Sequence, residues 1–299
     1  MKKYLLITSD VKVFRGKPHY RIKALTDIPQ YGVVFGDLGG WVQGEHNLSH
    51  NGDCWVTEDA VVSDKAIVTG NAYISGQAKV LDSARVTHSA RVSGRALVGE
   101  KARISGWAYI ADRTQISGSA CIMDYAYVCD DARIFGYARV TGDAHVYDEA
   151  IIRDEAHVGG TARILGSSII KDTACVFGMG RIKSSIVGGN AWIDGDVSLI
   201  DGVTVDGVIS LTASFTLSAE EYPIHLKHDK DIYVFKNNWS SGRTFCYIPK
   251  YKRWHVGCFI GTGDELIKKA YADSKLSGDM YFSYVKLVDT LESERREGD

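Results

Sequence analysis

The sequence predicts a mainly β protein in which short parallel strands wind around a three-sided core, followed by a small C-terminal α+β domain. Three regularities support this fold. A valine or isoleucine occupies every sixth position from Val56 to Ile182, 22 times in succession. In 18 of these repeats an alanine stands two residues earlier, and in all but two an aspartate, glutamate or glycine stands two residues later. No proline occurs between residues 30 and 222, which fits a ladder that needs every backbone N–H.

Each six-residue unit is expected to form one short strand and one corner. The β-branched residue suits a strand and fills the core. The alanine two residues earlier points to the same side, because strand side chains alternate with period two. Aspartate or glycine two residues later suits a turn, and glycine accepts a positive φ. Six residues have no helical period and are too few for a hairpin, so we expect three units to close an 18-residue coil that stacks at about 4.8 Å.

The chain divides into four predicted parts. Residues 1–52 are expected to form an N-terminal β cap over the open end of the coil, with Trp41 plugging the first turn. Residues 53–211 form the six-residue repeat. Residues 212–230, which contain a proline and mixed charges, are expected to be a linker. Residues 231–299 are expected to form the small α+β domain.

Local patterns predict the elements of the two end segments. Thr262-Gly263-Asp264-Glu265 is a capping-box pattern that predicts a helix start, and Ser277-Gly278 precedes a second helical pattern. Alternating apolar residues predict three strands in the cap and three in the tail domain. These are Tyr4–Ile7, Val11–Phe14, Tyr20–Leu25, Ile232–Lys236, Arg243–Ile248 and Trp254–Phe259.

Composition excludes several classes of protein. Hydrophobic residues make up 45% and charged residues 24% of the chain, which excludes a disordered or fibrous protein. The net charge of −2 creates no global field that would attract nucleic acid or membrane. We find no apolar run long enough to span a bilayer or to act as a signal peptide, so no membrane partner is expected. The six cysteines include no CxxC pair, which favours a reducing cytoplasm and predicts no metal site.

The repeat carries a family resemblance. Its motif Ala-x-Val/Ile-x-Gly/Asp-x resembles the hexapeptide repeat of left-handed parallel β-helix proteins. The left hand is implied by this resemblance alone. The general rule for crossovers would favour the right hand. Gly39-Gly40-Trp41-Val42, followed by Leu48-Ser49 and Gly52-Asp53-Cys54-Trp55, is similar to the YdcK-type proteins of enterobacteria. Those proteins are uncharacterised and carry the label of acetyltransferase.

The resemblance implies one function, and the repeat favours another. Hexapeptide-repeat acyltransferases use a histidine as general base and bind acyl-CoA between the subunits of a homotrimer. His145 and His157 each precede a core valine and point outward, so they are the candidate catalytic residues. Such sites usually involve an extruded loop, yet no residue is inserted between Val56 and Ile182. The sequence leaves two functions open. One is an acyltransferase with an unknown acceptor, which needs acyl-CoA as co-substrate and no other cofactor. The other is a non-catalytic trimeric scaffold or binding protein.

The residues that precede the core positions form three outer columns, one on each face of the predicted prism. Aromatic and arginine side chains on face 1 suit a subunit interface, or stacking against sugars, bases or the adenine of CoA. Cross-strand packing on a plain surface is the alternative. Face 1 carries Trp55, Tyr73, Arg91, Tyr109, Tyr127, His145, Arg163 and Arg181, of which the first five are candidate binding residues. Face 2 carries Val61, Lys79, Leu97, Gln115, Arg133, Ile151 and Ile169, and face 3 carries Ile67, Arg85, Arg103, Cys121, Arg139, His157 and Cys175.

The tail domain carries a second charge pattern. No acidic residue occurs between Ile232 and Gly263, where basic residues alternate with aromatic ones. Lys250, Lys252 and Arg253 are candidate binding residues for nucleic acid or another polyanion. The alternative is a half-buried sheet with solvated lysines. The expected partners are two further copies of the chain. A small-molecule or polyanionic ligand is a further possibility, and any nucleic acid would bind only through this domain.

Overall fold

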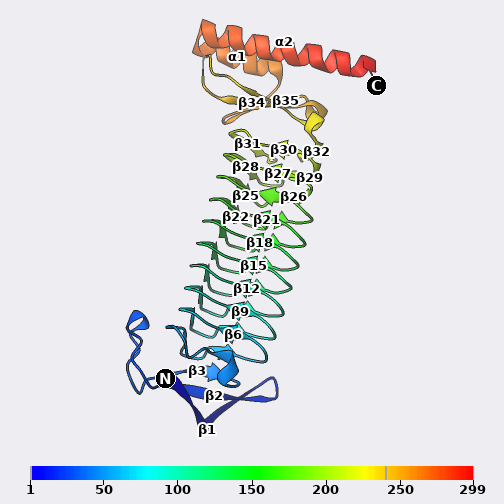
Figure 1. Cartoon of the computed structure of the whole chain (residues 1–299). Coiled ribbons are helices and arrows are strands. Elements are labelled where there is room, and N and C mark those ends of the chain that lie inside the picture. The colour runs from blue at the N-terminus through cyan, green and yellow to red at the C-terminus, as the bar shows by residue number, and fades with distance from the viewer. Residues whose placement is uncertain (1, 240, 299) are drawn as a thin grey trace.

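The computed structural model, which describes residues 2–239 and 241–298, confirms the predicted fold class. Stacked coils form a long prism with the N-terminal cap at one end and the C-terminal domain across the other (Figure 1). Three sheets run along the prism, with 10 strands on face 1, 13 on face 2 and 9 on face 3. A separate four-stranded sheet belongs to the C-terminal domain. In the described part of the chain, no helix combines the length and apolar character needed to cross a bilayer.

The strands of the three faces alternate in the order face 1, face 2, face 3 along the repeat. Face 1 consists of β4 (Trp55–Val56), β7 (Tyr73–Ile74), β10 (Arg91–Val92), β13 (Tyr109–Ile110), β16 (Tyr127–Val128), β19 (His145–Val146), β22 (Arg163–Leu165), β25 (Arg181–Lys183), β28 (Val197–Ile200) and β31 (Phe215–Ser218). Face 2 consists of β1 (Tyr4–Phe14), β2 (Lys17–Ala24), β3 (Leu38–Val42), β5 (Val61–Val62), β8 (Lys79–Val80), β11 (Leu97–Val98), β14 (Gln115–Ile116), β17 (Arg133–Ile134), β20 (Ile151–Ile152), β23 (Ile169–Ile170), β26 (Ile186–Gly189), β29 (Thr204–Val208) and β32 (His225–His228). Face 3 consists of β6 (Ile67–Val68), β9 (Arg85–Val86), β12 (Arg103–Ile104), β15 (Cys121–Ile122), β18 (Arg139–Val140), β21 (His157–Val158), β24 (Cys175–Val176), β27 (Trp192–Ile193) and β30 (Ser210–Leu211).

The predicted register is confirmed throughout the repeat. Tyr127 pairs in parallel with His145, and Val128 pairs with Val146, so three repeat units complete one coil. The backbone N–H of Tyr127 donates to the carbonyl of Ala144 at 2.9 Å, and equivalent bonds continue along the stack. The valine, isoleucine and alanine side chains of the repeat are almost all fully buried and form one continuous core. Apolar burial along the whole prism is therefore the main stabilising contribution.

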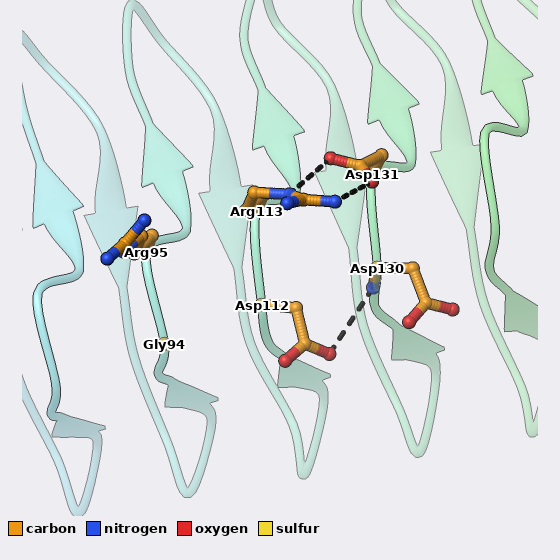
Figure 2. A pocket seen from close by; sticks show the side chains of 6 residues that line it. All are labelled: Gly94, Arg95, Asp112, Arg113, Asp130 and Asp131. Atoms are coloured by element: carbon orange, nitrogen blue, oxygen red, sulfur yellow. Dashed lines mark hydrogen bonds and ion pairs between the residues drawn. The ribbon is translucent and has the colours of Figure 1, made fainter.

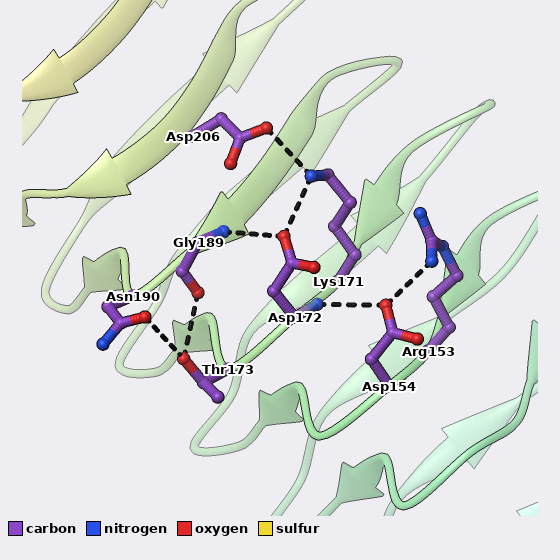
Figure 3. A network of polar contacts seen from close by, with 8 residues as sticks. All are labelled: Arg153, Asp154, Lys171, Asp172, Thr173, Gly189, Asn190 and Asp206. Carbon is purple, nitrogen blue, oxygen red and sulfur yellow. Dashed lines mark hydrogen bonds and ion pairs between the residues drawn. The ribbon is translucent and has the colours of Figure 1, made fainter.

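The corners explain why aspartate, glutamate and glycine recur two residues after each core position. The corner residue takes a left-handed conformation, with φ of 59° at Asp130 and 58° at Asp172. Where the corner one coil earlier is acidic, its carboxylate accepts a hydrogen bond from this residue's backbone N–H. Asp112 Oδ2 accepts from the N–H of Asp130 at 3.4 Å (Figure 2), and Asp172 Oδ2 accepts from that of Gly189 at 2.9 Å (Figure 3). Acidic corners thus tolerate the conformation and also satisfy a backbone donor of the next coil.

The N-terminal cap extends face 2 beyond the first coil. β1 and β2 form an antiparallel hairpin, and β2 pairs with β3. The two strands predicted at residues 4–7 and 11–14 form the single strand β1, whose pairing shifts register between Ile7 and Val11. β3 then pairs in parallel with β5, so it is the first strand of the coil itself. The edge of face 2 is thereby covered at its N-terminal end.

The expectation that Trp41 plugs the first coil is wrong. Trp41 pairs with Val61, an outer position, so its side chain lies on face 2 and not in the core. It is only 7% exposed because Arg21 lies over its ring at 4.3 Å from the ring centre, with Lys12 at 5.4 Å. The first coil is closed instead by side chains of the hairpin, among which Tyr4 is fully buried. Long cationic side chains cover the indole by cation–π contact.

Residues 212–230, for which the sequence predicts a linker, form the last part of the coil. Within them β31 pairs with β28 on face 1, and β32 pairs with β29 on face 2. Leu217 follows its partner Leu199 at the usual spacing of the repeat, whereas the interval from Val205 to its partner Leu226 is longer. This longer last turn, which contains Pro223, breaks the period and hides the final coil in the sequence.

The C-terminal domain is a sheet with two helices on one face. The sheet contains β33 (Tyr233–Lys236), β34 (Thr244–Ile248), β35 (Arg253–Val256) and β36 (Phe259–Gly261), one strand more than predicted. The helices are α1 (Gly263–Asp273) and α2 (Lys275–Gly298). The predicted start of α1 is confirmed, since Thr262 Oγ1 accepts from the N–H of Glu265 at 3.3 Å. Phe245 and Trp254 pack towards the helices, while Cys246 and Ile248 on the opposite face join the core of the prism.

Candidate functional site

The centre of face 1 carries a continuous aromatic stack, made of Tyr109, Tyr127 and His145. The two tyrosine rings lie parallel with an interplanar angle of 8° and centres 5.3 Å apart. The His145 ring follows at 5.5 Å from Tyr127. Arg91 precedes the stack and Arg163 follows it in the same register. Because these coils have the same length, side chains at the same place in successive coils become neighbours at van der Waals distance.

The N-terminal end of face 1 is covered by the cap. Trp55 is 1% exposed and belongs to the core, so its assignment as a binding residue is corrected by this burial. Tyr73 stacks on Tyr31 of the cap, with ring centres 4.4 Å apart, and Arg91 lies 6.0 Å from the same ring. The accessible part of the column therefore begins beyond Tyr73. The sequence places Trp55 in the correct column but gives no sign of the segment that packs over it.

Two further aromatic residues, missed by the sequence analysis, border the stack. Trp107 is 57% exposed and Tyr125 is 63% exposed. Each stands two residues before a stack tyrosine, at the corner that leads from face 3 to face 1, and they are one coil apart. Because they are one coil apart, the spacing that predicts the outer columns could also have identified these two residues in the sequence. Together with Tyr109 and Tyr127 they form an exposed aromatic surface over two adjacent coils, and such surfaces on a monomer commonly mark an interaction site.

The two candidate catalytic histidines lie on different faces, so the fold does not bring them together. His145 is the last ring of the stack on face 1. On face 3, His157 Nε2 lies 3.0 Å from Thr141 Oγ1, and its ring meets the edge of Phe177 at 4.8 Å. Burial, and then the charge of Arg139, lower the pKa of His157, so its imidazole is neutral at pH 7. In the described part of the chain no carboxylate contacts His157 to orient it as a base.

The basic residues of the tail domain share a surface with few of its aromatic residues. Lys250 and Lys252 are exposed in the turn between β34 and β35, where Lys250 lies 5.1 Å from the Tyr251 ring centre. Arg253 is partly buried at the start of β35. Phe245 and Trp254, two of the aromatic residues that alternate with the basic ones, are buried between the sheet and the helices. The interleaved pattern therefore mostly describes the core of this domain.

A groove of about 390 Å³ follows the corner between face 1 and face 2 (Figure 2). It contains an ion pair in which Arg113 Nε donates to Asp131 Oδ1 at 2.7 Å. Beneath it, ligand-type atoms of Asp112, Cys129 and Asp130 lie within 4.8 Å of one another. Burial, and then the hydrogen bond to Asp130, raise the pKa of Cys129 to about 12, which keeps the thiol protonated and a poor metal ligand. We assign these residues to the structural ladder of the corners.

Comparison with known proteins adds no family. No family model matches the chain, and no curated protein is significantly similar to it. The candidate surface is therefore assigned from its own geometry.

Proposed function

We propose that the protein is a non-catalytic β-helix scaffold that self-associates through face 1. The partly exposed stack of Tyr109 and Tyr127, bordered by the exposed Trp107 and Tyr125, is the observation that carries this proposal. Tyrosine, tryptophan and arginine are the residue types that contribute most to protein interfaces. A homotrimer, the assembly implied by the resemblance to hexapeptide-repeat proteins, would bury one such surface from each chain.

The regularity of the coil supports a scaffold over an enzyme. From β4 to β25 each strand follows the last at a fixed spacing, so no extruded loop encloses a reaction centre beside the prism. A general base also needs a group that holds its ring in place, and the column on face 1 places Tyr127 on one side of His145 and Arg163 on the other, neither of which is a carboxylate. A flat, repeating surface is better suited to matching another copy than to enclosing a substrate.

Substitution of the stack tests the scaffold. Tyr109→Glu combined with Tyr127→Glu places two carboxylates side by side in the interface, and we expect a monomer of 32.8 kDa. Tyr137→Glu is the matched control. Tyr137 is 67% exposed, but it lies at the corner between face 2 and face 3, away from face 1. Sedimentation velocity measures the mass, and circular dichroism checks the β-sheet signal. An unchanged mass in the double variant would contradict the assignment of face 1.

An acyltransferase remains the second candidate because of His157. Its neutral imidazole lies among Thr141, Phe177 and, beyond Phe177, the 45% exposed Trp192, which offers an aromatic surface to an adenine ring. If acyl transfer occurs, His157→Ala should reduce turnover by ~10²-fold or more while leaving acyl-CoA affinity unchanged. His145→Ala is the control. Release of the CoA thiol from acetyl-CoA, assayed with hydroxyl and amine acceptors, gives the rate, and absence of acetyl-CoA binding at millimolar concentration would exclude this candidate.

A further inference from the structure

A polar cavity of about 330 Å³ lies where the last coil meets the C-terminal sheet. β31 forms one wall with Thr216, and the C-terminal sheet forms the other with Lys236, Arg243, Thr244 and His255. This volume lies in the range of cavities that hold small ligands. The cavity is distinct from the aromatic surface of face 1 and from the turn that carries Lys250 and Lys252.

Strand pairing explains why these side chains converge. Lys236 pairs directly with Thr244, and His255 pairs with Cys246, two residues further along β34. Side chains alternate between the faces of a sheet, so Lys236, Thr244 and His255 share the face that Cys246 directs towards the prism. Arg243 immediately precedes β34 and reaches the same margin.

The cavity carries positive charge that the protein does not neutralise. Lys236 and Arg243 are both exposed, and within the described residues neither forms an ion pair with a carboxylate. None of the residues that line the cavity is acidic. A nearby carboxylate, that of Asp196, accepts a hydrogen bond from Ser214 at 3.2 Å. Two free cations in a concave site raise the local concentration of anions.

His255 adds a buried donor to these cations. The side chain is 3% exposed, and its Nε2 lies 2.5 Å from the hydroxyl of Tyr222, which comes from the last turn of the coil. Burial raises the pKa of Tyr222 to about 12 and lowers that of His255 to about 4, so the phenol keeps its proton and the imidazole is neutral. When the phenol donates to Nε2, the ring proton is on Nδ1. No described residue hydrogen-bonds Nδ1, which leaves it as a donor for a ligand.

The edge of the prism supplies backbone donors to the same cavity. β31 is the last strand of face 1, so its outer row of N–H and C=O groups has no neighbouring strand to pair with. Thr216, on this strand, is exposed to the cavity. Backbone N–H groups, hydroxyls and cations together form a set dominated by hydrogen-bond donors, which suits an oxyanion with several acceptor oxygens.

We propose that this cavity is a binding site for the phosphate group of a small phosphorylated molecule, held by Lys236, Arg243 and His255. The site goes beyond the scaffold function, and it does not depend on self-association through face 1. Phosphate matches the donor set because its oxygens accept hydrogen bonds from Arg243 and from the neutral His255 ring, while Lys236 supplies charge. The remaining volume accommodates the group to which the phosphate is attached.

Calorimetric titration of the full chain with inorganic phosphate tests the site. We expect saturable binding that weakens at least about 10-fold in Arg243→Ala and in Lys236→Ala, the effect of losing one charged hydrogen bond. Both side chains are exposed, so both variants should fold, which circular dichroism verifies. Lys250→Ala is the matched control, since it removes an exposed cation of the same domain outside the cavity.

Two results would overturn the proposal. One is the absence of saturable binding at phosphate concentrations up to about 10 mM. The other is an equal loss of affinity in Lys250→Ala, which would show attraction to the overall charge of the domain. Binding that is lost in Arg243→Ala and retained in Lys250→Ala supports the site whether the protein is a monomer or a trimer.

Discussion

Replacing Asp172 tests the role of the corner carboxylates most sharply. Asp172 Oδ2 accepts hydrogen bonds from the N–H of Gly189 and from Lys171 Nζ, both at 2.9 Å (Figure 3). Its own backbone has φ of 58°. Asp172→Ala removes the acceptor and leaves a residue with a Cβ in a conformation that alanine adopts poorly. Asp172→Asn keeps a side-chain oxygen and a residue type that tolerates this conformation.

The expected cost of Asp172→Ala is about 2 kcal/mol. Loss of the hydrogen bond to the N–H contributes about 1 kcal/mol, discounted because the carboxylate is 44% exposed. The left-handed conformation adds roughly 1 kcal/mol for alanine. The exposed ion pair with Lys171 contributes at most a few tenths. For Asp172→Asn we expect a loss of less than about 1 kcal/mol, because only the charge is removed.

Urea unfolding followed by circular dichroism measures these differences. Asp143→Ala is the control. Asp143 is exposed and lies beside a corner, and its carboxylate accepts no hydrogen bond from the described residues. Its substitution should change the free energy of unfolding by no more than about 0.5 kcal/mol. The reasoning is refuted if Asp172→Ala behaves like Asp143→Ala, or if the alanine and asparagine variants of Asp172 lose equal stability.

The same carboxylate predicts a pH dependence. The N–H of Gly189, and then Lys171, hold the pKa of Asp172 below its ordinary value. A group whose pKa is lower in the folded chain contributes stability above its unfolded pKa of about 3.9, and this contribution is lost as the pH falls through the folded pKa. The stability difference between the unmodified protein and Asp172→Asn should therefore shrink on acidification. A difference that stays constant from pH 7 to pH 2 would contradict this.

Two further substitutions test the register and the C-terminal domain. Val128→Asp should unfold the coil, because an unpaired buried carboxylate costs several kcal/mol. Tyr127→Asp, which changes an outward side chain, should keep the β-sheet signal in circular dichroism. An equal loss of this signal in both variants would disprove the inward register. Thr262→Ala removes the N-cap of α1 and should lower the free energy of unfolding by about 1 kcal/mol, measured by urea unfolding. Thr262→Ser keeps the hydroxyl and should be close to neutral, so a loss as large as that of the alanine variant would exclude the cap as the cause.

The coil could be predicted from the sequence because each unit repeats the same local requirement. Val128 and its counterparts must fill a narrow core, and Asp130 and its counterparts must turn a left-handed corner, so both positions are visible in every unit. The column of Tyr109, Tyr127 and His145 follows directly from that spacing. The helix start at Thr262 was equally visible, since capping depends on neighbouring residues only.

Features that depend on distant packing could not be predicted. Trp55 lies in the predicted column, but its burial depends on a cap whose position no local pattern specifies. The last coil was hidden because its turn before Leu226 is longer than the others. The cavity around His255 lies between β31 and the C-terminal sheet. The basic pattern around Lys250 indicates a different part of that domain. Tertiary contacts of this kind have no fixed sequence spacing.

The mass of the unmodified protein in solution is the most direct test of the central claim that face 1 mediates self-association. Light scattering coupled to size-exclusion chromatography gives this mass independently of shape, which matters for a long prism. The account predicts three times the chain mass of 32.8 kDa. A single species of 32.8 kDa at micromolar concentration would contradict it, because the aromatic surface of Tyr109 and Tyr127 would then face water in the functional protein.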